Sequence, residues 1–280
     1  METHTDDILP VPADEAMSGM KYLEGFFHGL RPIERITVTE WSDKYRYLSS
    51  VASPEPGRYR SSRAPYMRKV MDCMSDFAPY RKIVMMKGAQ ITWTEICCNF
   101  IGYSMHIAPA PVLMVEPIDD MVTLISKTRI DTMIDACPEL LSRVSASKSR
   151  DGKNTINLKT FPGGVLRLTG ANSAAGLRAM PAKILILDEV DGYPPEVGGE
   201  GNPVDLAIAR TSSFEGKKKI LIGSTPINLS VDKVLNIAKT ITTLKIKLPV
   251  SGETLTRTML LTAKHKTIEP LFNKKFWENF

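Results

Sequence analysis

Three short polar clusters carry the side chains of this chain that could do chemistry together. They are residues 87–94, the pair Asp188-Glu189 and the pair Ser224-Thr225, and each follows a short apolar run. A lysine and backbone N–H groups at a helix start bind phosphate, whereas hydroxyl and carboxylate oxygens are ligands that Mg²⁺ prefers. The clusters therefore predict a site for phosphate and a divalent cation, provided that the fold brings them together.

The acidic pair is the most informative cluster. Four apolar residues, Ile184 to Leu187, lead directly into Asp188 and Glu189. A buried strand of this kind carries an Asp to a Mg²⁺ ion in P-loop NTPases, and a neighbouring Glu can orient and deprotonate an attacking water. The alternative is a strand followed by a turn or a helix cap, because Asp favours both.

The first cluster lies where a phosphate-binding loop would lie, between a strand and a helix. A standard loop reads G-x-x-x-x-G-K-[ST], and here the frame reads KGAQITWT. Thr94 fits the last position, but Lys87 and Thr92 occupy the glycine positions and Trp93 the lysine position. Lys87 could supply the positive charge from the start of the loop. The alternative is a plain strand, turn and helix with a surface lysine and a packed tryptophan.

The third cluster, Ser224-Thr225, ends another apolar run and is followed by Pro226. Hydroxyl groups at such a position could sense a terminal phosphate and couple its hydrolysis to movement. A simple exit from a strand into a turn, with proline ending the ladder, explains the same residues.

Apolar runs of strand length alternate with helical patterns along the chain. We expect strands at 83–86, 111–115, 184–187 and 219–223, a hairpin from 154–161 and 165–169, and helices at 66–77, 94–107, 119–137 and 204–210. This alternation predicts an α/β fold with a mostly parallel sheet covered by helices on both faces. Such sheets place ligands at the carboxyl ends of their strands, where the three clusters lie.

Charge and composition divide the chain into three parts. Residues 1–37 form a polar, acidic leader that lacks the features of a signal peptide, with a short helix-like patch at 20–30. Residues 38–226 form the predicted domain, and residues 227–280 form a tail with nine Lys/Arg against four Asp/Glu. The chain has no run of 18 apolar residues, so we expect no membrane partner. Its four cysteines lack the spacing of a zinc site or a disulfide framework.

Residues 38–226 resemble the large terminase subunit of tailed bacteriophages, in the lambda-type GpA family. The segments EWSDKYRYLSS, EPGRYRSSRAPYM, MMKGAQITWTE, TFPGGVLRLTGANSAAGLR, ILILDEVDGYPPEVGGEGNPVDLAIAR and GSTP carry the resemblance. It implies a RecA-like P-loop NTPase that uses ATP and Mg²⁺ to drive double-stranded viral DNA into a procapsid in the host cell cytoplasm. The implied partners are the small terminase subunit and the portal protein, on which the chain would assemble as an oligomer.

The resemblance also implies a role for individual residues. Asp188 would bind the metal with Thr94, Glu189 would activate water, and Ser224 and Thr225 would form the coupling motif. Tyr45 or Tyr47 could stack on adenine, and Arg178 is a candidate transition-state arginine. The residues expected to hold the triphosphate are Lys87, Gly88, Ala89, Gln90, Ile91, Thr92, Trp93 and Thr94. Thr92 departs from this pattern, since the family usually has glycine at that position. A side chain there disfavours the positive φ that glycine adopts easily.

The resemblance stops at Pro226. Family members continue into a metal-dependent nuclease, whereas the acids of residues 227–280 are isolated, so we expect no nuclease activity of this chain. An alternative interpretation is a truncated, degenerate prophage remnant without ATPase or nuclease activity. A helicase-like cellular ATPase would share the acidic pair, but the segment EVDGYPPEVGGEGNP after it favours a terminase.

Overall fold

The computed structural model describes residues 35–87, 90–144 and 154–225, together with Leu23, Phe26 and the backbone of two strands near the C-terminus. The chain divides into two compact units, Met1–Arg35 and Ile36–Phe280, and the fold below is that of the second unit. The predicted patch at 20–30 and the loop residues Gly88 and Ala89 lie outside the described residues, apart from Leu23 and Phe26.

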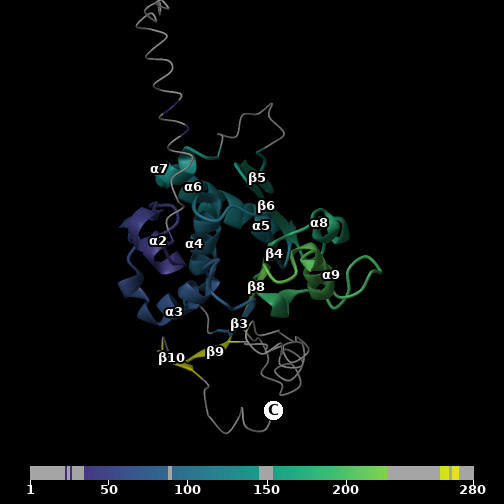
Figure 1. The fold of residues 1–280 in the computed structure, drawn as a ribbon. Helices are drawn as coiled ribbons and strands as arrows, with labels where there is room; N and C mark the ends of the chain where they lie inside the picture. The colour runs from purple at the N-terminus through teal and green to yellow at the C-terminus, as the bar shows by residue number, and fades with distance from the viewer. Residues whose placement is uncertain are drawn as a thin grey trace, which may run out of the picture. The chain divides into compact units, whose positions relative to one another are not determined.

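A single sheet forms the centre of the second unit (Figure 1). Its neighbours run in the order β10-β9-β3-β8-β7-β4-β6-β5, and the six inner strands are parallel, while β10 and β5 pair antiparallel at the two edges. The strands are β3 (Lys82–Met86), β4 (Val112–Glu116), β5 (Leu158–Phe161), β6 (Gly164–Gly170), β7 (Ile184–Leu187), β8 (Lys219–Ser224), β9 (Met259–Lys264) and β10 (Thr267–Pro270). The predicted mostly parallel sheet is confirmed.

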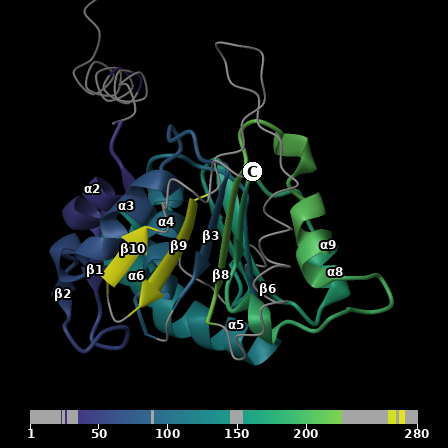
Figure 2. The same ribbon diagram turned by 90° about the horizontal axis from the view of Figure 1, so that it is seen from below.

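Helices cover both faces of this sheet, as predicted (Figure 2). Successive side chains of a strand point to opposite faces, so Val112 and Met114 of β4 join one core cluster, while Leu113 and Val115 join the other. The larger cluster includes helices α2 (Val38–Tyr45), α3 (Pro65–Met74) and α4 (Trp93–His106). The smaller cluster includes helices α8 (Ala174–Arg178) and α9 (Pro203–Ala209).

Burial on both faces explains why the inner strands are continuous apolar runs. All four residues of β7 are buried, with Ile184 and Ile186 in the larger cluster and Leu185 and Leu187 in the smaller one. Each such side chain contributes about 1.5–3 kcal/mol when it leaves water. This burial holds the end of β7, and hence the acidic pair that follows it, at a defined place.

The predicted helix 119–137 is divided into three segments. Helix α5 (Asp119–Ile125) continues into a π-helical segment, η2 (Ser126–Asp131), and then into α6 (Thr132–Ala136). The Ser126 hydroxyl donates a hydrogen bond to the Ile156 carbonyl, which ties η2 to the turn before β5. Helix α7 (Pro138–Leu141) follows directly, with a proline at its first turn.

The proline- and arginine-rich segment after α2 is largely irregular, as predicted. It contains two short strands, β1 (Tyr47–Leu48) and β2 (Gly57–Arg58), which pair antiparallel, and a 3-10 turn, η1 (Ser61–Arg63). Two further 3-10 turns lie beyond β7, η3 (Val190–Gly192) and η4 (Ser212–Phe214).

Among the described residues, no helix is both long and apolar enough to span a bilayer. All four cysteines are buried and none is in a disulfide.

Two strands come from the segment that the sequence analysis treats as a separate tail. Strand β9 runs parallel to β3, with Ile83 opposite Met259, and β10 pairs antiparallel with β9. The described part of residues 227–280 thus extends the sheet beyond the strand that precedes the predicted phosphate loop.

Candidate active site

The carboxyl ends of three neighbouring strands bring the three polar clusters together. Lys87 follows β3, Asp188 follows β7, and Ser224 ends β8, which lies between them. The Lys87 amide donates a hydrogen bond to the Ser224 carbonyl at 2.9 Å, and the Asp191 amide donates to the Ser224 hydroxyl at 2.9 Å. Residues more than 100 positions apart in the sequence therefore share one edge of the sheet.

Thr94 and Asp188 form the pair best suited to a divalent cation. The Thr94 hydroxyl, in the first turn of α4, donates a hydrogen bond to Asp188 Oδ2 at 2.8 Å. Asp188 is almost fully buried, and this burial raises the pKa of its carboxyl, while the hydrogen bond from Thr94 opposes the rise. A hydroxyl and a carboxylate side by side are oxygen ligands of the kind that Mg²⁺ takes, so these residues fit the ion.

Lys87 points toward the other acid of the pair. Its ammonium group forms an ion pair with Glu189 Oε1 and donates a hydrogen bond to the Thr225 hydroxyl at 3.0 Å. The Thr225 amide in turn donates to Glu189 Oε2 at 3.0 Å. The lysine at the start of the loop, the second acid and the third cluster thus form one hydrogen-bonded group.

Backbone strain is concentrated in the loop before α4 and at the acidic pair. Among the described residues, the non-glycine residues with positive φ are Gln90 (55°), Thr92 (67°) and Glu189 (49°), and all three lie here. A β-branched residue such as Thr92 is rare in the left-handed region, where a side chain costs about 1–3 kcal/mol. The side chain of Thr92 is expected to disfavour positive φ, yet the loop adopts that conformation.

Trp93 occupies the lysine position of a standard loop, yet its ring belongs to the core. It is 2% exposed and packs against Gly223 of β8, where a Cβ atom would overlap the indole ring. The indole Nε1 has no hydrogen-bond partner among the described residues. The charge that a standard loop carries at this position is therefore absent, and Lys87 supplies a charge from the opposite end of the loop.

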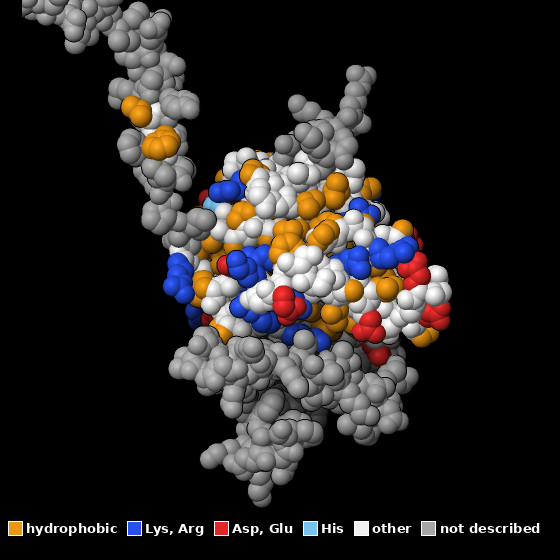
Figure 3. All heavy atoms as spheres, turned by 45° about the vertical axis from the view of Figure 1, so that its right-hand side comes forward, with side chains coloured by type: hydrophobic (Ala, Val, Ile, Leu, Met, Phe, Trp, Pro, Cys, Tyr) orange, Lys and Arg blue, Asp and Glu red, His pale blue; other side chains and the backbone are white. Residues whose placement is uncertain are grey.

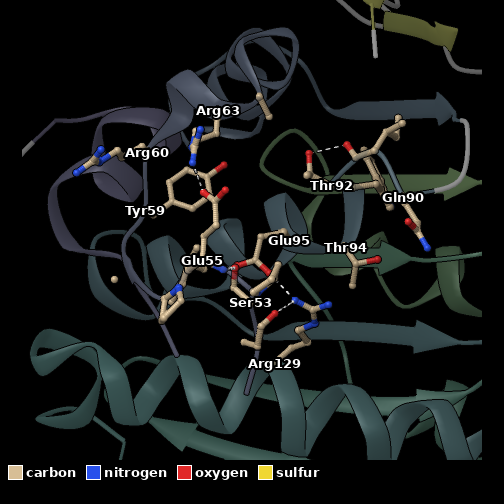
Figure 4. Close-up of a pocket in the computed structure, with 18 of the residues that line it drawn as sticks. Ser53, Glu55, Tyr59, Arg60, Arg63, Gln90, Thr92, Thr94, Glu95 and Arg129 are labelled. Atoms are coloured by element: carbon tan, nitrogen blue, oxygen red, sulfur yellow. Dashed lines mark hydrogen bonds and ion pairs between the residues drawn. The ribbon is translucent and has the colours of Figure 1, made fainter. Parts of the chain in front are cut away.

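A pocket of about 910 Å³ opens beside these residues (Figure 4). Such a volume suits a small-molecule or cofactor ligand. One wall is the predicted loop from Gln90 to Thr94, with Lys87 and Glu189. The facing wall comes from the arginine-rich segment 52–64, and Glu95 and Arg129 also line the pocket. Four arginines that the sequence patterns did not identify as site residues also line the pocket: Arg58, Arg60, Arg63 and Arg129. The high arginine content of residues 53–65 could have indicated the first three.

A buried ion network fixes the first turn of α4. Arg46 is fully buried, and its guanidinium contacts Glu95 Oε1 at 2.7 Å. Arg129 of η2 contacts Glu95 Oε2 at 3.2 Å (Figure 4). Arg46 also donates a hydrogen bond to Asn99 Oδ1 one turn further along α4. Glu95 follows Thr94 directly, so this network holds the helix start that presents the Thr94 hydroxyl.

Three predicted site residues lie elsewhere in the described structure. Arg178 is half-exposed and pairs with Glu200 at 2.9 Å, and Tyr45 packs edge-on against His106 with ring centroids 4.8 Å apart. Tyr47 is exposed in β1. None of the three lines the pocket. Their suggested roles remain predictions.

An aromatic that the sequence analysis passed over does line the pocket. The ring of Tyr59 is buried in its wall, and burial raises the pKa of its hydroxyl to about 12. The phenol therefore stays protonated at neutral pH. Its backbone amide is held by the Arg46 carbonyl, which ties this wall to the ion network under α4.

Glu116 is a buried acid that the sequence analysis did not single out. It ends β4, the neighbour of β7, and is fully buried. Burial raises the pKa of its carboxyl well above the ordinary value, and the nearby charges of Asp188 and Glu189 raise it further. Tyr193, in the same region, donates its hydroxyl to the Val115 carbonyl at 2.7 Å.

Comparisons with known proteins agree on one family. Residues 53–243, more than half of the chain, match the family described as phage terminase large subunit gpA, ATPase domain. The large terminase subunit of Enterobacteria phage P21 is 26% identical over 192 residues. That alignment covers 68% of this chain and 29% of the relative, so the chain spans under a third of the length of that curated protein.

The fold has a counterpart among solved structures. The large terminase of bacteriophage HK97 superposes with a TM-score of 0.54 at 11% sequence identity, covering 77% of this chain and 45% of that one. At this identity the similarity concerns the fold alone. It agrees with the mostly parallel, helix-covered sheet described above.

Proposed function

Since the chain belongs to the family of phage terminase large subunit gpA ATPase domains, we propose that it binds and hydrolyses ATP in its RecA-like domain. The work done would be the movement of double-stranded viral DNA into a procapsid. The observation that carries the proposal is that Lys87, Thr94 and Glu189 line one pocket, with Asp188 hydrogen-bonded to Thr94 beside it. These side chains supply a phosphate-binding charge, two cation ligands and a base.

The cation and the phosphates would be held by separate parts of the site. Thr94 and Asp188 would hold Mg²⁺, which neutralises negative charge on the transferred phosphoryl group when it is bound. Lys87 and the loop at the start of α4 would hold the triphosphate, because a helix N-terminus and a lysine both attract anions. The arginines on the facing wall would add to this positive field.

Glu189 would orient and deprotonate the attacking water. Its carboxylate accepts hydrogen bonds from Lys87 and from the amide of Thr225, which directly follows β8, so a shift of this acid would act on the end of that strand. These contacts support the proposal that Ser224 and Thr225 couple hydrolysis to movement. Arg178 could act on the transition state only after leaving Glu200.

The proposed polymer partner is double-stranded DNA. On the face shown in Figure 3, Lys and Arg side chains lie across the described surface among apolar ones, and several acidic side chains lie toward one margin. Contacts of basic side chains with phosphates weaken as salt rises, because bound counterions are released on association. DNA-stimulated ATP turnover that falls steeply between low and high salt would support this partner.

Phosphate release from ATP by the purified chain tests the proposal. We expect turnover in Mg²⁺ that is lost in Glu189→Gln while nucleotide binding is retained, and that is unchanged in Glu196→Gln, an exposed acid in the loop after η3. Undetectable nucleotide binding by the wild-type chain would refute it. The small terminase subunit and the portal protein are the proposed protein partners, with oligomerisation on the portal in the host cytoplasm.

One observation favours the second candidate, a degenerate remnant without activity. The loop contains Thr92 in a strained conformation and Trp93 in place of the usual lysine. If the wild-type chain binds nucleotide without turnover and Thr92→Gly restores turnover, the chain is a terminase ATPase that this one residue has inactivated. We propose no nuclease activity for either, and site-specific nicking of DNA by the pure chain with Mg²⁺ or Mn²⁺ would contradict this.

A further inference from the structure

Glu116 and Asp188 are neighbours on one face of the sheet. Strands β4 and β7 pair in parallel with Val115 opposite Leu187, so the next residues on the two strands are Glu116 and Asp188. Because side chains alternate along a strand, Glu116 shares the face of Met114, which belongs to the core cluster that contains α4. Asp188 shares the face of Ile186 in the same cluster. Both carboxyl groups therefore lie on the face that α4 covers.

The two acids differ in how they are bound. Asp188 accepts the hydrogen bond of Thr94. Both carboxyl oxygens of Glu116 are buried and have no hydrogen-bond partner among the described residues. Buried polar atoms are nearly always paired in native proteins, so an orphaned carboxyl group calls for a ligand or an ordered water.

Groups near Glu116 that could pair with it are already engaged. The hydroxyl of Tyr193 donates to the Val115 carbonyl, and the ammonium of Lys87 contacts Glu189 and Thr225. Two acids side by side in a buried place repel each other unless a positive charge compensates them. A cation, or water molecules bound to one, would compensate both acids and supply the partner that Glu116 lacks among the described residues.

We propose that Glu116 is a positioning residue of the divalent cation site, where it accepts hydrogen bonds from water molecules bound to the ion held by Thr94 and Asp188. This inference rests on the proposed function. Mg²⁺ sheds its waters reluctantly and usually keeps several, so carboxylates beside the site bind the ion through them.

The test is the affinity of Mn²⁺ for the full chain in the presence of a non-hydrolysable ATP analogue, measured from the electron paramagnetic resonance signal of free Mn²⁺. We expect Glu116→Gln to weaken Mn²⁺ binding by about 10- to 100-fold, the usual effect of losing an outer partner of a metal site. Asp188→Asn should weaken it at least as much, and Glu196→Gln should leave it unchanged. Binding of the analogue without metal should be the same in wild type and Glu116→Gln.

The controls separate a site role from a packing role. Thermal unfolding without metal should show Glu116→Gln at least as stable as wild type, because the amide removes a buried acid. If that variant fails to fold, Glu116→Asp retains the charge but withdraws it by one methylene, and the same loss of Mn²⁺ affinity is expected. Unchanged Mn²⁺ affinity in the folded variant would overturn the inference. Failure of wild type to bind Mn²⁺ with nucleotide would instead refute the proposed function.

Discussion

The ammonium group of Lys87 and the carboxylate of Glu189 form an ion pair across 102 positions of sequence. One is the residue that we expect to attract phosphate, and the other is the acid that we expect to activate water. An incoming triphosphate would compete with Glu189 for the lysine, so nucleotide binding would release the base as it engages the charge. Under the proposed function, nucleotide binding would thus free the carboxylate of Glu189 to act on water.

Replacement of Lys87 by Met should weaken ATP binding by roughly 10- to 100-fold. Hydrogen bonds to charged groups contribute about 1.5–3 kcal/mol, and among the described residues Lys87 is the one lysine that lines the pocket. Equilibrium binding of a fluorescent ATP analogue measures the effect. Lys217→Met, which changes an exposed lysine outside the pocket, is the matched control. Equal affinities of the two variants would show that Lys87 does not contact the nucleotide.

Replacement of Thr92 by Gly should stabilise the fold. Relief of the left-handed strain is worth about 1–3 kcal/mol, and the greater freedom of glycine in the unfolded chain offsets about 0.5–1 kcal/mol of it. Urea unfolding measures the net gain, which we expect to be about 1 kcal/mol. Ser213→Gly, at an exposed position of η4 without positive φ, should be destabilising. A loss of stability at position 92 would mean that the threonine makes compensating contacts.

Replacement of Gly223 by Ala should destabilise the chain by about 1–3 kcal/mol, since the added methyl group would overlap the indole ring of Trp93. The cost should fall in a Trp93→Leu background, where a smaller side chain leaves space for the methyl group. A double-mutant cycle with urea unfolding measures this coupling. Additive effects of the two changes would show that the ring does not press on β8.

Replacement of Glu95 by Gln should cost about 3–5 kcal/mol, because it leaves the guanidinium of Arg46 buried without its counter-charge. The matched control is Glu55→Gln, whose ion pair with Arg63 is exposed on both sides. Exposed pairs contribute about 0–1 kcal/mol, so this variant should remain close to wild type. Chemical unfolding compares the two, and similar losses would contradict the assigned role of burial.

The buried amine of Lys219 should make stability depend on alkaline pH. Its ammonium donates to the carbonyls of Cys73, Ala78 and Tyr80, yet burial lowers its pKa to about 7 from 10.5. Between these two values the unfolded chain binds more protons than the folded one, so stability rises with pH. The free energy of unfolding of wild type, measured relative to that of Lys219→Met, should therefore rise by up to about 1.4 kcal/mol per pH unit from pH 7 to pH 10. A difference that stays flat over this range in urea unfolding would contradict the lowered pKa.

Much of the fold was predictable because its signals are local. The apolar run Ile184 to Leu187 indicates a strand buried on both faces, and the order of strands and helices predicts a parallel sheet. Parallel strands bring their carboxyl ends to one edge, so the meeting of Lys87, Glu189 and Thr225 could be expected from the same pattern.

The remaining features depend on contacts between distant segments, and no local pattern reveals them. Nothing in the sequence near Arg46 shows that a carboxylate 49 positions away will bind it. Glu116 is a single acid at the end of an apolar run, a pattern typical of an ordinary strand end. Its burial beside Asp188 depends on the pairing of β4 with β7. Tyr59 and the loop arginines line the pocket because the segment 52–64 folds back over α4, a path that composition does not predict.

The π-helical turn η2 decides which way the side chains of residues 126–131 face. A π-turn accommodates one residue more than an α-helical turn, and each residue rotates a helix by about 100°. In this register Arg129 reaches the pocket and Glu95, while Ile130 and Met133 stay in the core. Deleting a single residue from 126–131 would convert η2 into ordinary helix and leave the faces of α5 and α6 nearly unchanged, because a π-turn absorbs one extra residue. Side chains inside the segment would turn to other directions, and we expect Arg129 to lose its contact with Glu95.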